Sequence, residues 1–259
     1  MKTHKLPAHF LVLACLSLLS FSRAAVYTYN GNGNTGANGA IGQGTLELSD
    51  SGSTIRGTVT LEGGSPGNFA DYLVLYIDSK PGGFADTTSF SDASTAETRT
   101  ISGFSGGARA TANFAPNFGA DYAIVLSRTG SAHSLYELAS GTALGPSKNI
   151  SFSDSGYNKW QFSFDLNDIG ASGAYFKFQS TCLYSGGAGY RSLESYESLT
   201  GNPGFYTVTF GNFNTFGVDS VPETTNAALA VFGGLALAVG VATRVRGYMG
   251  RKGQGLKGN

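Results

Sequence analysis

The sequence predicts an all-β protein whose body is a single β-sandwich of the jelly-roll kind, and three observations predict it. Glycine supplies 38 of the 259 residues, and each glycine inside a helix costs about 1 kcal/mol relative to alanine, so an all-helical protein is disfavoured. Apolar and polar residues alternate in short runs bounded by Gly, Asn, Asp and Ser, as strands and turns require. The 41% hydrophobic and 12% aromatic content favours a packed core over disorder.

Residues 1–24 are predicted to be a signal peptide. Lys2 and Lys5 precede an apolar run from Phe10 to Leu19, and small residues follow, with cleavage expected after Ala24. The expected partners of this segment are the Sec translocase and signal peptidase. The body is then expected to span residues 25–220, outside the cytoplasm.

The first half of the body contains the clearest strand patterns. Val26–Tyr29, Thr45–Leu48 and Thr54–Leu61 alternate, and Asp50–Ser53 is typical of a hairpin turn between the last two. Asp71–Asp78 is almost continuously apolar, which predicts a strand buried on both faces.

The remaining expected strands bring the number to about a dozen, as in a sandwich or jelly roll. They are Thr98–Ile101, Ala108–Phe114, Asp121–Leu126, Ser134–Leu138, Asn149–Ser153, Lys159–Leu166, Ala174–Thr181 and Phe205–Phe210.

One internal echo places Asp-Tyr at the entry of two apolar strands, in Asn68–Leu75 and in Asn117–Leu126. Equivalent central strands of two facing sheets explain it, as does a decayed duplication. Asp71 and Asp121 are then either ligands at one end of the sandwich or, as such residues more often are, acceptors that close turns.

The net charge of zero is the sum of three unlike segments. Residues 1–25 carry three basic residues, residues 26–220 carry nine basic and sixteen acidic residues, and the remainder carries five basic residues and one acidic residue. The body is therefore acidic, which argues against nucleic-acid binding because phosphates would be repelled.

The C-terminal segment, residues 221–259, combines three features. The short motif Val221-Pro222-Glu223-Thr224 is followed by an uncharged apolar run, 227–243, and then by a basic tail, 244–259. A helix of that run would span about 25 Å, slightly less than the roughly 30 Å hydrocarbon core. The basic residues would hold the tail in the cytoplasm; they are Arg244, Arg246, Arg251 and Lys252.

This arrangement resembles the sorting tail of bacterial PEP-CTERM proteins. The resemblance implies export, a transient stay in the membrane and processing by an exosortase-type enzyme, in Gram-negative bacteria that make exopolysaccharide. Pro222 and Glu223 match the motif, residues 227–242 match the membrane segment, and Arg244 and Arg246 match the basic stop; Thr224 stands where the usual motif has a second proline. An ordinary anchor that is never cleaved remains the alternative.

The second half of the body, Trp160–Phe210, is similar to exported carbohydrate-binding and DOMON-like β-sandwich modules. The similarity lies in Phe164–Gly170, Phe176–Phe178 and Tyr190–Ser195. It implies a sandwich more than a particular ligand, since a fold does not determine a function.

Several residues match catalytic or ligand-binding patterns by letter, but their context favours strands and turns. Gly31–Gly36 fits a dinucleotide loop, and Gly63–Gly67 and Gly103–Gly107 fit a nucleophile elbow, yet none is followed by a predicted helix.

The candidate titratable residues give no stronger signal. Glu194 with Glu197, or Asp165 with Asp168, could form a glycosidase pair or, for the aspartates, a calcium loop. His133 and Cys182 are too few for zinc, and Cys182 is expected to be a buried apolar side chain. The sequence therefore predicts no catalytic residue, no metal and no cofactor.

Aromatic residues in or beside Gly/Ser-rich loops are the remaining candidates, as platforms on which sugar rings stack. They are Tyr157, Trp160, Tyr184, Tyr190 and Tyr196, of which Trp160 also fits a core position. The leading hypothesis is an exported, non-enzymatic protein of the cell surface or extracellular matrix associated with exopolysaccharide. A carbohydrate-binding module is the alternative, and an exported hydrolase is third.

Overall fold

The computed structural model describes residues 25–34, 41–62, 71–105, 107–127, 133–154, 158–171, 173, 175–184, 191–201 and 207–217. The chain divides into two units, residues 1–217 and 218–259, and the description below concerns the first. The predicted cleavage site at Ala24 and the whole tail from Val221 onward lie outside the described residues. No helix within the described ranges is long and apolar enough to cross a membrane.

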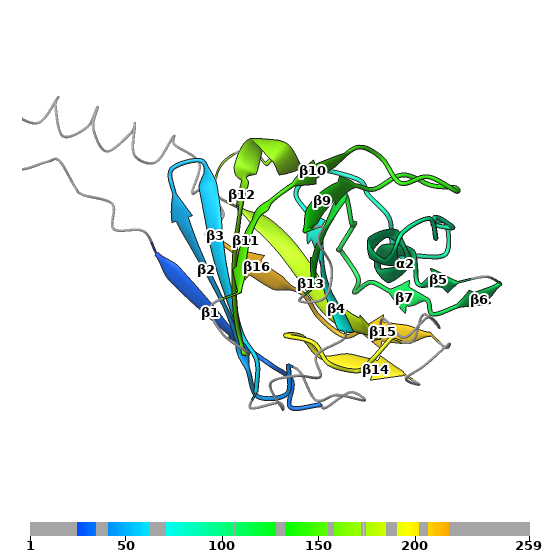
Figure 1. The fold of residues 1–259 in the computed structure, drawn as a ribbon, viewed down its shortest axis with the longest axis horizontal. Helices are drawn as coiled ribbons and strands as arrows, with labels where there is room; N and C mark the ends of the chain where they lie inside the picture. The colour runs from blue at the N-terminus through cyan, green and yellow to red at the C-terminus, as the bar shows by residue number, and fades with distance from the viewer. Residues whose placement is uncertain are drawn as a thin grey trace, which may run out of the picture. The chain divides into compact units, whose positions relative to one another are not determined.

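The fold is all-β, as the sequence predicts, and the strands of its two largest sheets pair antiparallel (Figure 1). A five-stranded sheet has the order β1-β2-β3-β12-β11 and a six-stranded sheet has the order β10-β9-β8-β4-β13-β16. The bounds of these strands are β1 Val26–Asn30, β2 Thr45–Ser51, β3 Thr54–Thr60, β4 Asp71–Asp78, β8 Tyr122–Ser127, β9 Ser134–Glu137, β10 Ser147–Asn149, β11 Ser151–Asp154, β12 Lys159–Asp165, β13 Phe176–Tyr184 and β16 Asn214–Phe216.

Shorter elements complete the unit. A three-stranded sheet has the order β14-β15-β7, and β5 pairs with β6. Their bounds are β5 Phe104–Ser105, β6 Ala108–Arg109, β7 Ala112–Asn113, β14 Leu199–Gly201 and β15 Val208–Phe210, with one α-helix, α2 Ala96–Ser102, and one 3₁₀ helix, η1 Leu166–Ile169, among the described residues.

The strand β4 is buried on both faces, which confirms the prediction from its continuous apolar run. Leu73, Leu75 and Ile77 belong to a hydrophobic cluster that also takes side chains from the five-stranded sheet. The alternate residues, represented by Val74 and Tyr76, belong to a second cluster formed with the segments around α2, β7 and β15. Because successive strand residues point to opposite faces, a strand with two buried faces must be apolar throughout.

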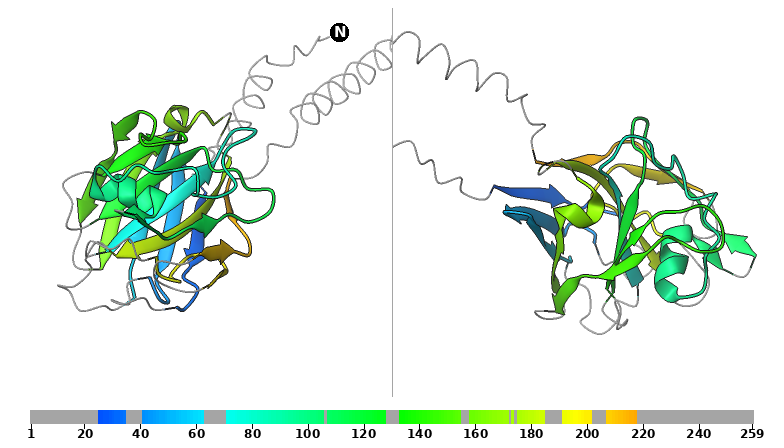
Figure 2. Two further views of the ribbon diagram at one scale, coloured as in Figure 1. Left: turned by 90° about the vertical axis from the view of Figure 1, so that its right-hand side faces the viewer. Right: turned by 90° about the horizontal axis from the view of Figure 1, so that it is seen from above.

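The first cluster takes side chains from both large sheets, and the second packs on the other face of the six-stranded sheet. Figure 2 shows α2 and the small strands on that other face. Trp160 on β12 is fully buried in the first cluster, 6.1 Å from the Phe152 ring. The six-stranded sheet therefore carries a hydrophobic cluster on each of its two faces.

The helix α2 corrects the predicted strand Thr98–Ile101. The Thr95 side chain accepts a hydrogen bond from the Thr98 N–H, and the Thr98 hydroxyl oxygen accepts one from the Thr95 N–H, which forms a capping box. Gly103 ends the helix in the left-handed conformation, with φ of 65°. Three β-branched residues, Thr98, Thr100 and Ile101, made this short segment resemble a strand and obscured the capping signal.

The echo of Asp-Tyr sequences does not mark equivalent strands of two facing sheets. It marks β4 and β8, which are antiparallel neighbours in one sheet, with Leu75 opposite Ile124. Of the two roles considered for Asp121, the structure shows the acceptor that closes a turn. Its Oδ2 accepts hydrogen bonds from the N–H groups of Ser79 and Lys80, at 3.0 and 2.9 Å.

The other predicted strands differ from the observed ones mainly at their ends. The hairpin at Asp50–Ser53 is confirmed, with Ser51 opposite Thr54. The predicted strand 108–114 is divided into β6 and β7, and 149–153 spans the end of β10 and most of β11. β14 and β16 are short strands that the alternation did not indicate.

Candidate functional site

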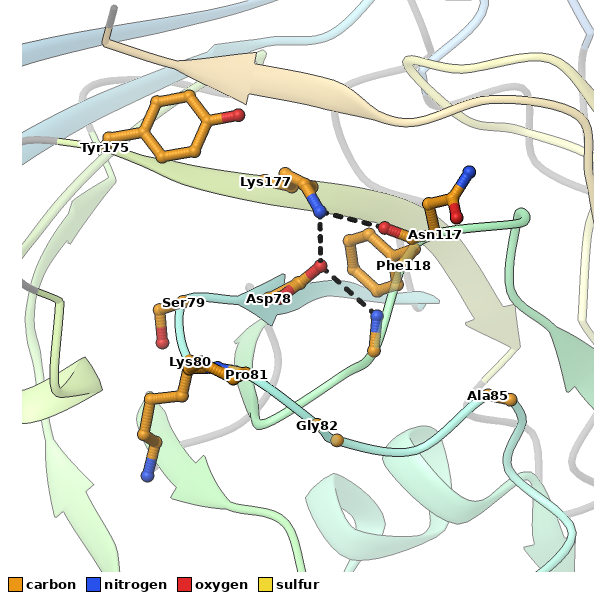
Figure 3. Close-up of a pocket in the computed structure, with 12 residues that line it drawn as sticks. Asp78, Ser79, Lys80, Pro81, Gly82, Ala85, Asn117, Phe118, Tyr175 and Lys177 are labelled. Carbon is orange, nitrogen blue, oxygen red and sulfur yellow. Dashed lines mark hydrogen bonds and ion pairs between the residues drawn. The ribbon is translucent and has the colours of Figure 1, made fainter. Parts of the chain in front are cut away.

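A cleft of about 600 Å³ lies at the end of β4 and the start of β13. It is lined by Asp78 and the loop 79–83, by residues 117–119 before β8, and by Tyr175 and Lys177 (Figure 3). We refer to it as the β4–β13 cleft. None of these lining residues was predicted as a site residue from the sequence. Asp121, which was considered as a ligand, does not line the cleft but accepts hydrogen bonds from the N–H groups of Ser79 and Lys80, which do.

Two loops approach each other backbone to backbone along one wall of the cleft. The Phe84 and Ala120 backbones exchange two hydrogen bonds of 2.9 Å. A Cβ atom on Gly119 would lie 1.8 Å from the Gly82 carbonyl oxygen, so this contact requires glycine. The wall is fixed by main-chain contacts.

An ion pair forms the floor of the cleft. Lys177 Nζ lies 3.0 Å from Asp78 Oδ2 and donates a second hydrogen bond, of 2.8 Å, to the Asn117 carbonyl oxygen. Asp78 Oδ2 also accepts from the Gly119 N–H at 3.2 Å. Figure 3 shows Lys177 pointing from β13 toward Asp78 on β4. These bonds connect β4, β13 and the loop 117–119.

The second lysine of the cleft is also partnered. Lys80 Nζ lies 3.5 Å from Glu137 Oε1 and 4.4 Å from the centre of the Tyr122 ring. Contact with Tyr122, followed by the charge of Glu137, raises the pKa of Lys80. Both ammonium groups thus have nearby counter-charges, so the cleft offers no unpaired cation to an anionic ligand.

Two polar side chains of the cleft remain available. Tyr175 is half-buried and Asn117 is exposed, and neither side chain has a hydrogen-bond partner in the part of the chain that the structure describes. Asn117 has φ of 65°, a left-handed conformation that Asn adopts more readily than most residues. A phenol and an amide beside a wall of backbone groups suit hydroxyl-rich, uncharged ligands.

A second cluster of polar groups surrounds the buried carboxyl of Glu197. Its Oε2 accepts hydrogen bonds from the Ser180 N–H at 2.9 Å and from the hydroxyls of Ser180 and Ser195, and its Oε1 accepts one from Asn214 Nδ2 at 3.1 Å. Burial raises the pKa of Glu197 to about 7, although these donors oppose the shift. The Glu197 carbonyl oxygen accepts from Asn32 Nδ2 at 3.3 Å, so the cluster also holds the loop that follows β1.

The structure does not assemble the predicted sugar-stacking residues. Trp160 has no exposed surface, so its proposed stacking role is wrong: the indole packs in the core. Tyr196 is also buried. Tyr157, Tyr190 and the side chain of Tyr184 lie outside the described residues.

The acidic pairs considered for catalysis have structural partners. Asp165 precedes η1 and accepts from the Asn167 N–H at 2.8 Å, and Asp168 pairs with Lys148, so this segment is a turn between β12 and β13. Glu194 and Glu197 are both buried. No group of three or more potential metal ligands occurs among the residues with described positions.

The remaining motif residues also have structural surroundings. Asn32, in the dinucleotide-like loop, donates to the Leu193 carbonyl oxygen at 2.8 Å. Gly103 follows a helix rather than preceding one, opposite to a nucleophile elbow. His133 stacks on Phe152 with ring centres 3.5 Å apart. Cys182 is fully buried, as predicted.

Little in the sequence indicates the β4–β13 cleft. Its lysine and aspartate stand in separate strands whose pairing was not predicted, although Lys177 lies directly opposite Asp78 in the β13–β4 ladder. Asn117 in a Pro-Asn-Phe-Gly sequence was the one local sign of an unusual backbone.

Comparisons of the chain with protein-family models, with curated proteins and with solved structures give no match.

Proposed function

We propose that this chain is an exported, non-enzymatic protein of the cell surface or extracellular matrix, sorted through its C-terminal tail and associated with exopolysaccharide. Its body is a β-sandwich whose two large sheets share the first hydrophobic cluster. The observation that carries the proposal is the order of segments along the chain: an export signal, an acidic β-rich body, and the motif, apolar run and basic residues of residues 221–259.

Several features of the body support this proposal. The outward faces of β2, β3 and β12 consist of polar and charged side chains, as expected for a body that stays in water. Cys182 is fully buried, so its thiol is shielded from oxidants outside the cytoplasm.

The test is mass spectrometry of both ends of the full-length chain produced in a Gram-negative host that contains an exosortase. We expect an N-terminus at Ala25 and a C-terminus that lacks the basic residues. Glu223→Ala should leave the tail intact, Thr224→Pro should increase the processed fraction, and Asn226→Ala is the matched control. A cytoplasmic protein that retains Met1 would overturn export, and a surface fraction with the complete tail would overturn processing.

The second candidate function is carbohydrate binding, which the β4–β13 cleft favours. Its charges are paired internally, whereas the Tyr175 hydroxyl and the Asn117 amide are available beside a rigid backbone wall. The described outward-facing residues of the five-stranded sheet include no aromatic side chain, so a flat stacking platform on that face does not support the candidate.

A glycan array probed with the full-length protein tests this candidate. We expect binding to neutral glycans that is lost in the double variant Tyr175→Ala/Asn117→Gly, where glycine keeps the left-handed backbone available. Ser153→Ala, on the outward face of the five-stranded sheet, is the control and should bind normally. Binding by neither protein, or equal binding by both, would rule out the cleft as the glycan site.

A further inference from the structure

Among the described strands, β1 forms one edge of the five-stranded sheet and pairs with β2 alone. Figure 1 shows it at the margin of the sheet, in dark blue. An edge strand presents unpaired N–H and C=O groups that can accept a further strand, and proteins usually protect such edges.

A hydrogen bond of Gly31, the residue directly after β1, shows which β1 residues direct their backbone N–H and C=O groups away from β2. The Gly31 N–H donates to the Gly44 carbonyl oxygen at 2.8 Å, so residue 31 points its backbone groups toward the β2 side. Because these groups alternate along a strand, Tyr27 and Tyr29 point the same way. Val26, Thr28 and Asn30 therefore direct their N–H and C=O groups away from the sheet.

The sequence of β1 lacks the usual protective devices. Val-Tyr-Thr-Tyr-Asn contains no charge and no proline, and four of its five residues are β-branched or aromatic. The other edges of the large sheets differ: β11 ends in Asp154, β10 contains Lys148, and β16 has three residues. Val26 is 64% exposed, and it is the large hydrophobic side chain that stands exposed among the described residues.

We propose that β1 pairs antiparallel with β1 of a second copy of this chain, around a two-fold axis at Thr28. This register places Thr28 opposite Thr28 and Val26 opposite Asn30, and it uses every outward-directed residue of both strands. About six backbone hydrogen bonds would form. The pairing opposes no like charges, and it makes the two five-stranded sheets continuous.

Self-complementarity is the reason for choosing a second copy as the partner. A two-fold interface uses the same patch on both molecules, and β1 presents an uncharged patch that is compatible with itself. Tyr27 and Tyr29 are not needed for pairing, because they face inward: their rings lie 5.1 Å from Phe216 and 4.8 Å from Phe178. The proposal goes beyond the proposed function and does not depend on export or sorting.

Cysteine crosslinking of the purified full-length protein tests the register. In the proposed pair the two Thr28 Cα atoms are about 5.5 Å apart, within the range that a disulfide spans. Thr28→Cys should give a disulfide-linked dimer with a mild oxidant, whereas Ser153→Cys, exposed on the opposite edge strand, should stay monomeric. Cys182 does not interfere because it is fully buried, and Cys15→Ser in both variants removes the other cysteine of the chain. Equal crosslinking of both variants, or crosslinking of neither, would overturn the proposal.

The mass in solution provides the second test. Light scattering should give the wild-type protein twice the mass of one chain, and Thr28→Lys should return it to one chain because two ammonium groups would face each other. Ser153→Lys is the matched control, and unchanged unfolding midpoints establish that both variants fold. A wild-type monomer at every concentration, a doubled mass that persists in Thr28→Lys, or pairing of β1 with a different protein would each refute self-pairing.

Discussion

The buried carboxyl of Glu197 should make the stability of the body depend on pH in a defined direction. Its pKa is about 7 in the folded protein, because burial disfavours the ionised form, against an ordinary value of 4.5. The folded state therefore binds a proton more tightly than the unfolded state does. Stability is greatest below about pH 4.5, falls as the pH rises through about 7, and is then constant.

The size of the effect follows from the two pKa values. At about 1.4 kcal/mol for each pH unit, the difference between 4.5 and about 7 corresponds to a loss on the order of 3 kcal/mol of unfolding free energy. Glu197→Gln removes this dependence. It also costs about 1–3 kcal/mol at low pH, because the Gln amide cannot accept from both the Ser180 N–H and the Asn214 amide.

Urea unfolding of the full-length wild-type and Glu197→Gln proteins at several pH values between 4.5 and 8 measures the effect. The difference in unfolding free energy between the two proteins isolates Glu197 from other titrating groups, and it should shift by about 3 kcal/mol in favour of the variant across that range. Glu47→Gln, at an exposed position on β2, controls for the change in net charge. A difference that stays constant with pH would refute the reasoning.

Three further substitutions test the packing. Gly57→Ala should destabilise the protein by about 1–3 kcal/mol, because its Cβ would lie 2.2 Å from the Phe162 ring; an unchanged urea midpoint would contradict that contact. Thr95→Ala removes the acceptor for the first turn of α2 and should cost about 1 kcal/mol in the same assay, whereas no loss would show that the cap is dispensable. Asp78→Asn should cost about 1–3 kcal/mol by leaving the Lys177 ammonium without its carboxylate, and adding Lys177→Met should recover part of that loss; additive effects would indicate no coupling.

The fold could be predicted from the sequence where one physical cause acts alone. The continuous apolar run of β4 requires burial on both faces, and the alternation of β3 together with Gly52 produces a hairpin. These signals are local, so they appear in a single sequence. The order of strands in a sheet depends on contacts between distant segments. The sequence therefore led to the expectation that β4 and β8 lie in two facing sheets, whereas they are neighbours in one sheet.

The helix α2 was missed because a local propensity opposed the local capping signal. Thr98, Thr100 and Ile101 are β-branched and favour strands. Their helical conformation is stabilised by the Thr95 cap and by burial of Ile101 against the second cluster. Tertiary packing decides the conformation of a seven-residue segment, and its sequence alone carries too few residues to show a helical period.

The β4–β13 cleft could not be predicted because its parts come together only through strand pairing. Asp78 and Lys177 are separated by 99 positions in the chain, and each alone is an ordinary charged residue at a strand end. Sequence reasoning instead selected Trp160 and the tyrosines by residue type. Residue type indicates which contacts a side chain can make, whereas exposure is decided by which face of the strand it occupies, and the inward position of Trp160 on β12 follows from its register with β3.

The glycines connect these outcomes. Because glycine is frequent, three sequence motifs match catalytic patterns by residue type alone. In the described structure, glycines occupy positions where a Cβ atom would collide with a neighbour or where φ is positive. Gly57 makes room for the Phe162 ring, Gly103 ends α2, and Gly119 lets two loops meet at the wall of the cleft. A glycine-rich sequence of this kind favours close backbone approach and tight turns between short strands. In the β4–β13 cleft, the polar side chains without a hydrogen-bond partner among the described residues are those of Tyr175 and Asn117.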